Sequence, residues 1–160
     1  MAVMGEIPFT VDGAPVDFAR TVTYRGIMFT GVPNLAWTYG YGHYSRTLRV
    51  DLVGQFVCRL LQHMNRTGAI SVVPSLRPGE ESMELKPWAD TEYLNPGYLL
   101  RSLDRLPKRG DRPDWQHSQD YLYESEAIPR IDLTDPLFSY GYQTTPPVRA
   151  RARREENEPV

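Results

Sequence analysis

The chain has 160 residues, enough for one domain, and its net charge of -2 gives no general attraction for nucleic acid or for an anionic membrane surface. With 41% hydrophobic residues, 14 prolines and a mean hydropathy of -0.47, much of the chain is expected to be loop or tail. A single cysteine excludes an internal disulfide framework, and the lack of a long apolar run or a basic leader predicts a soluble, cytoplasmic protein without a membrane span.

The first residues predict a hairpin. Apolar residues alternate with polar or small ones over residues 7–11, and the Asp12-Gly13 pair follows at once. This pattern favours a tight turn with the return strand near residues 16–18. The β-branched and aromatic residues 21–24 predict a further short strand.

Two more strands are expected next. Residues 27–29 and 35–39 are apolar without strict alternation, which is typical of strands that are covered on both faces. Pro33-Asn34 lies between them and is interpreted as their turn.

The stretch after residue 45 predicts one long amphipathic helix. Large apolar residues recur at every fourth position, at Leu48, Leu52, Phe56, Leu60 and Met64. Ser45 or Thr47 is expected to cap the N-terminus, and Gly68 lies just past the end. About five turns of helix should therefore cover the sheet. Cys58 falls among these positions and is interpreted as a core residue rather than a nucleophile.

The second half of the chain is less regular. A strand is expected at residues 70–73, and a second helix is expected from Asn95-Pro96 to about residue 107, with a short helical turn near residues 119–125. Trp88 and Tyr93 are isolated anchors. Residues 144–160 are rich in Pro, Arg and Glu and are predicted to form a disordered tail, which leaves residues 1–143 as one compact unit.

Residues 40–45 connect the predicted strand to the helix with the pattern G-x-G-x-x-S, and we refer to them as the glycine loop. The pattern is a weak match to the dinucleotide fingerprint, because a serine replaces the third glycine and no acidic residue follows about 20 positions later. A helix N-terminus that faces an electron-rich group is a second interpretation, and an ordinary strand-to-helix turn is a third.

No self-sufficient active site is visible in the residues alone. The histidines His43, His63 and His117 are scattered without metal-ligand spacing, so no metal site is expected. His43 is the strongest candidate of the three, since it lies in the glycine loop. The aspartates form no pair whose spacing indicates acid–base catalysis; they are Asp104, Asp111, Asp114 and Asp120.

Several segments together resemble the C-terminal part of flavin-containing monooxygenases, and the closest branch is the bacterial Baeyer–Villiger-type group. The resemblance rests on VDG and PVD in residues 11–17, YRGIMF at 24–29, GVPNLAW at 31–37, TLRVDLV at 47–53 and VCRLL at 57–61. It continues through residues 97–110 to Trp115, so it covers most of residues 7–125.

The resemblance implies an enzyme that reduces FAD with NADPH, forms a C4a-peroxyflavin and inserts oxygen into a ketone or onto a soft heteroatom. The family's FAD and NADPH fingerprints lie upstream of the matching segment, so the expected partner is an N-terminal nucleotide-binding half, in cis or in trans. The chain would be an incomplete piece of an α/β FAD domain: a small sheet with a hairpin packed on a long helix, a further helix and an irregular tail.

In the family, the part that matches residues 40–48 approaches the pyrimidine side of the isoalloxazine ring. A helix N-terminus would stabilise the negative charge that reduced flavin carries near N1 and O2. The resemblance therefore implies a cofactor-binding set in which Thr47 and Leu48 act through backbone N–H groups. The full set is Gly42, His43, Ser45, Arg46, Thr47 and Leu48. It assigns no catalytic residue.

The chain departs from the family inside this set. Where the family usually has Asn-Ala-Ser-Trp before Thr-Leu, this chain has His43-Tyr44-Ser45-Arg46. The guanidinium either pairs with reduced flavin or a cofactor phosphate, or marks a chain under relaxed constraint. Two hypotheses follow: one part of a monooxygenase, inactive by itself, or a non-catalytic remnant or interaction module that docks a partner through open sheet edges.

Overall fold

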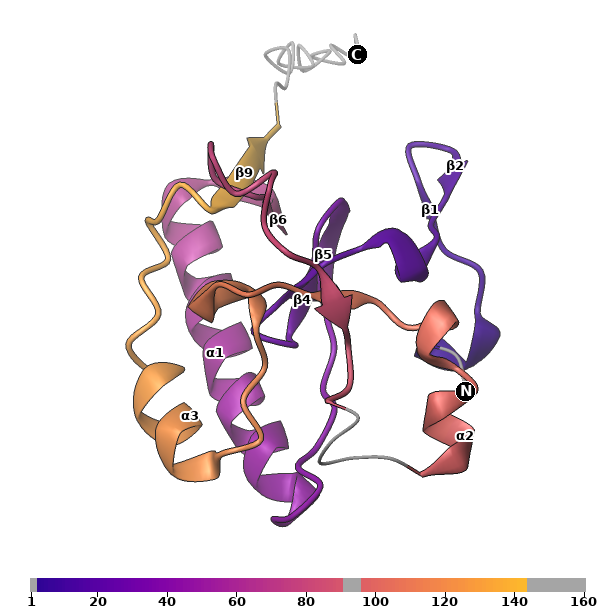
Figure 1. Cartoon of the computed structure of the whole chain (residues 1–160). Coiled ribbons are helices and arrows are strands. Elements are labelled where there is room, and N and C mark those ends of the chain that lie inside the picture. Colours follow the sequence, from indigo (N-terminus) through magenta and orange to yellow (C-terminus); the bar gives the residue numbers. More distant parts are fainter. Residues whose placement is uncertain (1–2, 91–95, 144–160) are drawn as a thin grey trace, which may run out of the picture.

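The helix α1 (Arg46–Thr67) is the longest element of the computed structural model, which describes residues 3–90 and 96–143 (Figure 1). Its position and apolar face are as predicted, with Leu52, Phe56 and Leu60 buried and Gly68 as the C-cap residue. Ser45 is the N-cap residue but makes no side-chain capping bond, because its hydroxyl pairs with the Thr47 hydroxyl at 2.7 Å.

Cys58 is exposed, so its interpretation as a core residue was wrong. Cys58 lies two residues from both Phe56 and Leu60, and residues two apart in a helix do not share a face. The thiol therefore lies on the side of α1 that faces away from the core.

The N-terminal hairpin is confirmed. Strands β1 (Thr10–Val11) and β2 (Ala14–Pro15) are antiparallel, and Asp12 and Gly13 in the turn have φ angles of 51° and 81°. The return strand begins earlier than predicted, and a 3₁₀ helix occupies Phe18–Arg20.

The central sheet has the order β3-β4-β5. Its antiparallel strands are β3 (Thr23–Tyr24), β4 (Met28–Phe29) and β5 (Val32–Ala36). The predicted Pro33-Asn34 turn was wrong, because both residues lie inside β5. The chain turns instead at Gly31, whose φ of 72° favours glycine.

Asn34 joins this sheet to the next one. Its side-chain Nδ2 donates to the Ile70 carbonyl at 3.1 Å, and the Val72 N–H donates to its Oδ1 at 3.0 Å. Both partners belong to β6 (Ala69–Pro74), the strand predicted after α1. β6 pairs with β9 (Phe138–Tyr142), a strand that the sequence analysis did not predict.

The predicted second helix is much shorter than expected. It consists of α2 (Gly97–Leu100), followed by a 3₁₀ helix at Leu103–Arg105. The Ser102 hydroxyl donates to the Tyr98 carbonyl at 2.8 Å, and such a bond competes with continued helix. The short helix predicted near residues 119–125 is confirmed as α3 (Tyr121–Ala127), which Asp120 caps. Asn95, Tyr93 and residues 144–160 lie outside the described residues.

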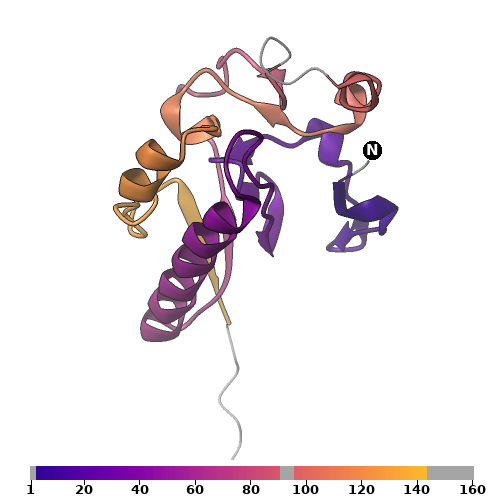
Figure 2. The same cartoon turned by 90° about the horizontal axis from the view of Figure 1, so that it is seen from below.

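The described residues form a mixed α/β arrangement with four small sheets rather than one. The fourth pairs β7 (Lys86–Pro87) with β8 (Lys108–Arg109). In Figures 1 and 2, α1 and α3 lie on one side and the hairpin and α2 on the other. One buried cluster packs around α1, and a second gathers Phe29, Trp88 and Leu99. No helix in this part of the chain is long and apolar enough to cross a membrane.

Candidate functional site

A buried ion pair fixes the position of the glycine loop. Arg49 Nε on α1 lies 2.9 Å from Glu124 Oε2 on α3, and Tyr41 donates its hydroxyl to the same oxygen at 2.6 Å. Arg49 also donates to the carbonyl of Tyr39 at 2.9 Å and to that of Arg25 at 2.8 Å. One side chain therefore fixes the loop, the turn before β4 and α3 relative to one another.

This arrangement raises the pKa of the Tyr41 hydroxyl. The main cause is burial, and the bond to the Glu124 carboxylate adds to it, since deprotonation would bring two negative charges together. Tyr41 therefore stays a neutral hydrogen-bond donor.

A cavity of about 330 Å³ lies beside the glycine loop, and we refer to it as the loop cavity. Four segments form its walls: Tyr39 with Gly42 and His43, residues 88–90, Arg109 of β8, and residues 117–120. Its lining is mainly apolar, and its volume is at the lower end of the roughly 300–1,000 Å³ typical of small-molecule sites. The loop cavity therefore suits one ring system rather than a whole dinucleotide.

His117 and Trp88 form one wall as a stacked pair, with ring centroids 4.4 Å apart and planes inclined by 23°. His117 Nε2 lies 2.5 Å from the Trp88 carbonyl oxygen. Burial lowers the pKa of His117 to about 4, because it penalises the charged imidazolium. His117 is therefore neutral at pH 7. Since a carbonyl only accepts, Nε2 carries the hydrogen and Nδ1 is left as an acceptor.

Two charged residues in the wall of the loop cavity form an ion pair. Arg109 lies 3.2 Å from Asp90 and donates to the Pro87 carbonyl at 3.0 Å. This pair therefore adds no uncompensated charge to the lining. The Asp120 carboxylate also lines the cavity and accepts the N–H groups of Leu122 and Tyr123 at 2.9 and 3.3 Å, which cap α3.

Only two residues of the predicted cofactor-binding set, Gly42 and His43, line the loop cavity. The Gly42 N–H donates to Gln119 Oε1 at 2.8 Å. The predicted Leu48 N–H is also engaged, because it donates to the Ser45 carbonyl at 3.2 Å. Ser45, Thr47 and Arg46 are exposed on the first turn of α1, so this end of the helix is not sealed. Cofactor binding by these residues stays a prediction.

Arg46 lies directly against the glycine loop. A Cβ atom placed on Gly40 would be 2.5 Å from Arg46 Cβ and 2.9 Å from its Cα. Only glycine allows this approach, so the spacing of loop and helix depends on Gly40.

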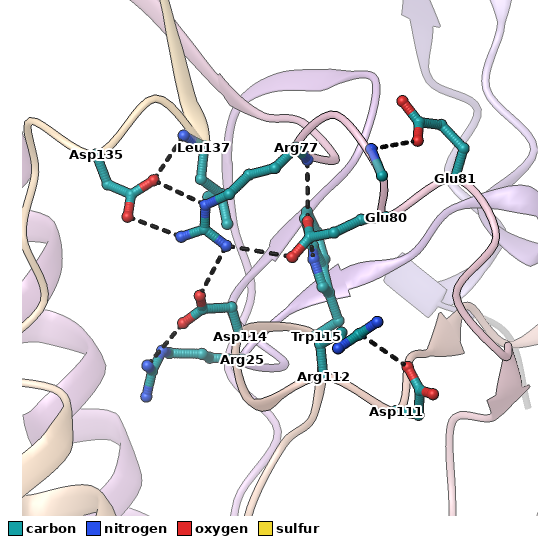
Figure 3. A network of polar contacts seen from close by, with 11 residues as sticks. Arg25, Arg77, Glu80, Glu81, Asp111, Arg112, Asp114, Trp115, Asp135 and Leu137 are labelled. Atoms are coloured by element: carbon teal, nitrogen blue, oxygen red, sulfur yellow. Dashed lines mark hydrogen bonds and ion pairs between the residues drawn. The ribbon is translucent and has the colours of Figure 1, made fainter.

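A network of ion pairs supports the segment that carries His117 (Figure 3). Arg77 donates to both oxygens of Asp135, at 3.2 and 2.7 Å, and to Asp114 at 3.0 Å. Asp114 also accepts from Arg25 at 2.7 Å. The bonds from Arg77 lower the pKa of Asp135, and that ion pair raises the pKa of Arg77. Arg77 also pairs with Glu80 at 3.3 Å. The network joins distant parts of the chain, and each of its charged groups has a partner of opposite sign, which is typical of a structural role.

Sequence reasoning missed most of the site. Arg49 could have been noticed as a charged residue within the apolar pattern of α1, one turn before Val53. Trp88 was recognised only as an isolated anchor, and Arg109 and Gln119 carry no local signal, because the three residues come together only in the fold. In the part of the chain that the structure describes, no three His, Cys, Asp or Glu side chains are grouped so as to hold a metal ion.

No protein-family model and no solved structure matches the chain. Curated relatives do match. The chain is 40% identical over 146 residues to "FAD-containing monooxygenase EthA" of Mycobacterium tuberculosis, covering 91% of this chain and 29% of the relative. It is 41% identical over 135 residues to EthA of Mycolicibacterium smegmatis, covering 84% and 26%.

A third relative is AlmA of Acinetobacter baylyi, whose name describes an FAD-binding monooxygenase. It is 32% identical over 142 residues, which cover 89% of this chain and 28% of AlmA. The chain thus spans less than a third of the length of each of these relatives. The resemblance to flavin-containing monooxygenases is thus confirmed at this level: over most of its length the chain is homologous to a segment of proteins named as FAD-containing or FAD-binding monooxygenases.

Proposed function

We propose that this chain is the C-terminal part of an FAD- and NADPH-dependent monooxygenase of the Baeyer–Villiger type, the part that closes the FAD site. The observation that carries the proposal is the 40% identity to EthA over 146 residues. The substrates would be ketones or compounds with a soft heteroatom. An N-terminal nucleotide-binding half, in the same polypeptide or in a second chain, would supply the fingerprints for FAD and NADPH.

The residues beside the glycine loop fit part of FAD. The loop cavity has room for a planar ring, and two buried nitrogen atoms in its wall, Trp88 Nε1 and His117 Nδ1, have no hydrogen-bond partner among the described residues. Buried polar groups are normally paired, so a ligand with a polar ring edge suits this wall. Gly42 and His43 would hold that ring from the side of the glycine loop.

FAD, when bound, would supply the oxygen-activating chemistry. This chain would bind and orient the ring and keep water from it, with Trp88 and His117 as one wall. Arg49 and Glu124 would fix the glycine loop at the ring edge, and the exposed first turn of α1 would favour negative charge there.

Co-expression tests the proposal. The chain should be purified alone and together with the upstream half that carries G-x-G-x-x-G, followed by a flavin spectrum and NADPH oxidation with a panel of ketones. We expect no flavin in the chain alone and a flavoprotein with activity in the pair. His43→Ala should lower flavin content, whereas Val50→Ala, at an exposed position on the next turn, should not. Yellow protein from the chain alone would contradict the assignment of the FAD fingerprint to the missing half.

A second candidate function is a non-catalytic interaction module. The small sheets favour it, because β6 and β9 carry the exposed apolar side chains Ile70 and Tyr142. A pair that assembles but holds no flavin, together with the absence of a G-x-G-x-x-G frame upstream, would support this candidate over the enzyme.

A further inference from the structure

The sheet that β6 and β9 form is closed along one edge only (Figure 1). On the β6 edge, the side-chain amide of Asn34 acts as a third strand would, because it accepts from the Val72 N–H at 3.0 Å and donates to the Ile70 carbonyl at 3.1 Å. On the other edge, β9 has no further strand beside it among the described residues. The open edge of this sheet is therefore the edge of β9.

The register of the two strands shows which backbone groups of β9 point toward the open edge. Val72 lies opposite Tyr140, and its N–H is turned away from β9 toward Asn34. In an antiparallel ladder, hydrogen-bonded pairs alternate with pairs whose N–H and C=O groups point outward, so Val72 and Tyr140 form a pair of the second kind. The N–H and C=O of Tyr140 therefore face the open edge. Phe138 has the same orientation, but its N–H already donates to the Asp135 carbonyl at 2.9 Å, which leaves Tyr140 at the centre of the open edge.

The side chains of β9 do not obstruct a neighbouring strand. Its five residues include no charged residue and no proline, two of the residue types that usually keep an exposed edge from pairing. Ser139 and Gly141, on either side of Tyr140, are small and leave room for another backbone. Ile70 and Tyr142 add apolar side chains that are 54% and 57% exposed. These features favour pairing with another uncharged strand.

We propose that β9 pairs with β9 of a second copy of this chain, antiparallel about a twofold axis at Tyr140. In this register the Tyr140 N–H of each copy donates to the Tyr140 carbonyl of the other. Ser139 of one copy then lies opposite Gly141 of the other, with Cα atoms about 4.5 Å apart, because this pair is next to a hydrogen-bonded one. The inference goes beyond the proposed function and does not depend on it.

Three observations favour a second copy as the occupant. The outward groups of Tyr140 are one donor and one acceptor, and a twofold axis brings each against its complement. No like charges meet, since the strand is uncharged and the net charge of the chain is only -2. The pairing also joins two two-stranded sheets into one sheet of four strands, and isolated two-stranded units are only marginally stable. Because one pair of strands buries little area, the dissociation constant of the dimer is expected in roughly the micromolar to millimolar range.

Sedimentation of the full chain from low micromolar to millimolar concentration tests the proposal, under reducing conditions that keep the exposed Cys58 from forming a disulfide. We expect a concentration-dependent dimer. Ser139→Lys should weaken it by about tenfold or more, because it brings two ammonium groups close to the axis. Ser139→Ala should not weaken it. Gln62→Lys adds the same charge on the exposed face of α1 and should also leave the dimer unchanged.

Nuclear magnetic resonance locates the contact. In a mixture of labelled and unlabelled chains, an intermolecular nuclear Overhauser effect should join Hα of Ser139 to Hα of Gly141. The Tyr140 amide should exchange rapidly in dilute solution and become protected as the concentration rises, which a change in folding alone would not produce.

A chain that stays monomeric at every concentration overturns the proposal. A dimer without the effect between Ser139 and Gly141 does so too, since its contact lies elsewhere, and so does equal weakening by Ser139→Lys and Gln62→Lys. Growth beyond the dimer would exclude a closed twofold contact. Protection of the Tyr140 amide in a one-to-one complex with the upstream half, with no dimer of this chain alone, would assign the edge to that half instead.

Discussion

Arg49 Nε and Glu124 Oε2 are 2.9 Å apart, and their side chains are only 1% and 5% exposed. The pair links the first turns of α1 to α3 across 75 residues of sequence. Arg49 also fixes the backbone at the start of the glycine loop, because it donates a hydrogen bond to the carbonyl of Tyr39, the residue before the loop. The geometry of the candidate site thus depends on one buried cation.

Arg49→Leu should therefore destabilise the fold strongly. It leaves the Glu124 carboxylate buried without its partner, which costs about 3–5 kcal/mol in the free energy of unfolding. The double variant Arg49→Leu/Glu124→Leu should recover part of that loss, because no uncompensated charge remains. Urea denaturation measures both, with Gln55→Ala on the exposed face of α1 as a control that should change stability by no more than about 0.5 kcal/mol. A double variant as unstable as the single one would refute the charge argument.

Asn34 makes the joint between two sheets, and substitutions there should separate its two roles. Asn34→Gly keeps the positive φ of 58° but removes both hydrogen bonds to β6, which should cost about 1–3 kcal/mol. Asn34→Ala should cost about 1 kcal/mol more, since alanine disfavours that backbone conformation. Denaturant titration of the two variants gives the difference. Asn65→Ala, exposed on α1, is the matched control and should not destabilise; equal stability of the two Asn34 variants would exclude a backbone contribution.

His117 should make the fold sensitive to mild acid. Its pKa is about 4 in the folded chain against an ordinary value of 6.5, so the unfolded chain takes up the proton first as the pH falls. The contribution of neutral His117 to the free energy of unfolding is then fully present above about pH 6.5. It is lost progressively between about pH 6.5 and pH 4, by up to about 3 kcal/mol. Urea unfolding at pH 7, 6 and 5 should show this slope, and His117→Phe should flatten it.

The lowered pKa values of Glu80 and Asp135 act in the same direction but at lower pH, because carboxylates lose their stabilising bonds only when they protonate. Persistence of the full slope between pH 6.5 and pH 5 in the His117→Phe variant would assign it to other groups.

Two glycines should respond in opposite ways to alanine. Gly40→Ala places a methyl group 2.9 Å from the Arg46 Cα, so either the loop or α1 must move, at about 1–3 kcal/mol. A methyl group on Gly54, in the exposed middle of α1, meets nothing within 4 Å and should stabilise by up to about 1 kcal/mol. Thermal unfolding distinguishes the two signs, and destabilisation by both substitutions would contradict the contact analysis.

The elements that could be predicted are those whose cause is local. The apolar repeat and Gly68 define α1, and Asp12-Gly13 defines the first hairpin. The turn at Pro33-Asn34 failed because the side chain of Asn34 bonds to β6, more than 30 residues away, a contact that no local pattern contains. Strand β9 was missed for the same reason, since its partner β6 lies far upstream.

The candidate site shows the same limit. The glycine loop could be recognised from the spacing of its glycines and from its resemblance to a family. Two of its residues, Gly42 and His43, line the loop cavity. The opposite wall, with Trp88 and His117, is assembled from segments that carry no periodic signal. Arg49 lies within a helix that the sequence predicts, but the sequence does not predict that its ion-pair partner is Glu124.

The close approach of Gly40 to Arg46 has a consequence for which residues can stand at position 46. A Cβ atom on Gly40 would first meet the Cα, Cβ and Cγ atoms of Arg46. A side chain with an unbranched β carbon keeps these atoms in place, whereas Val, Ile or Thr would add a second γ atom beside the closest point of the contact. Tolerance of substitution at this position should therefore depend on branching at the β carbon more than on charge.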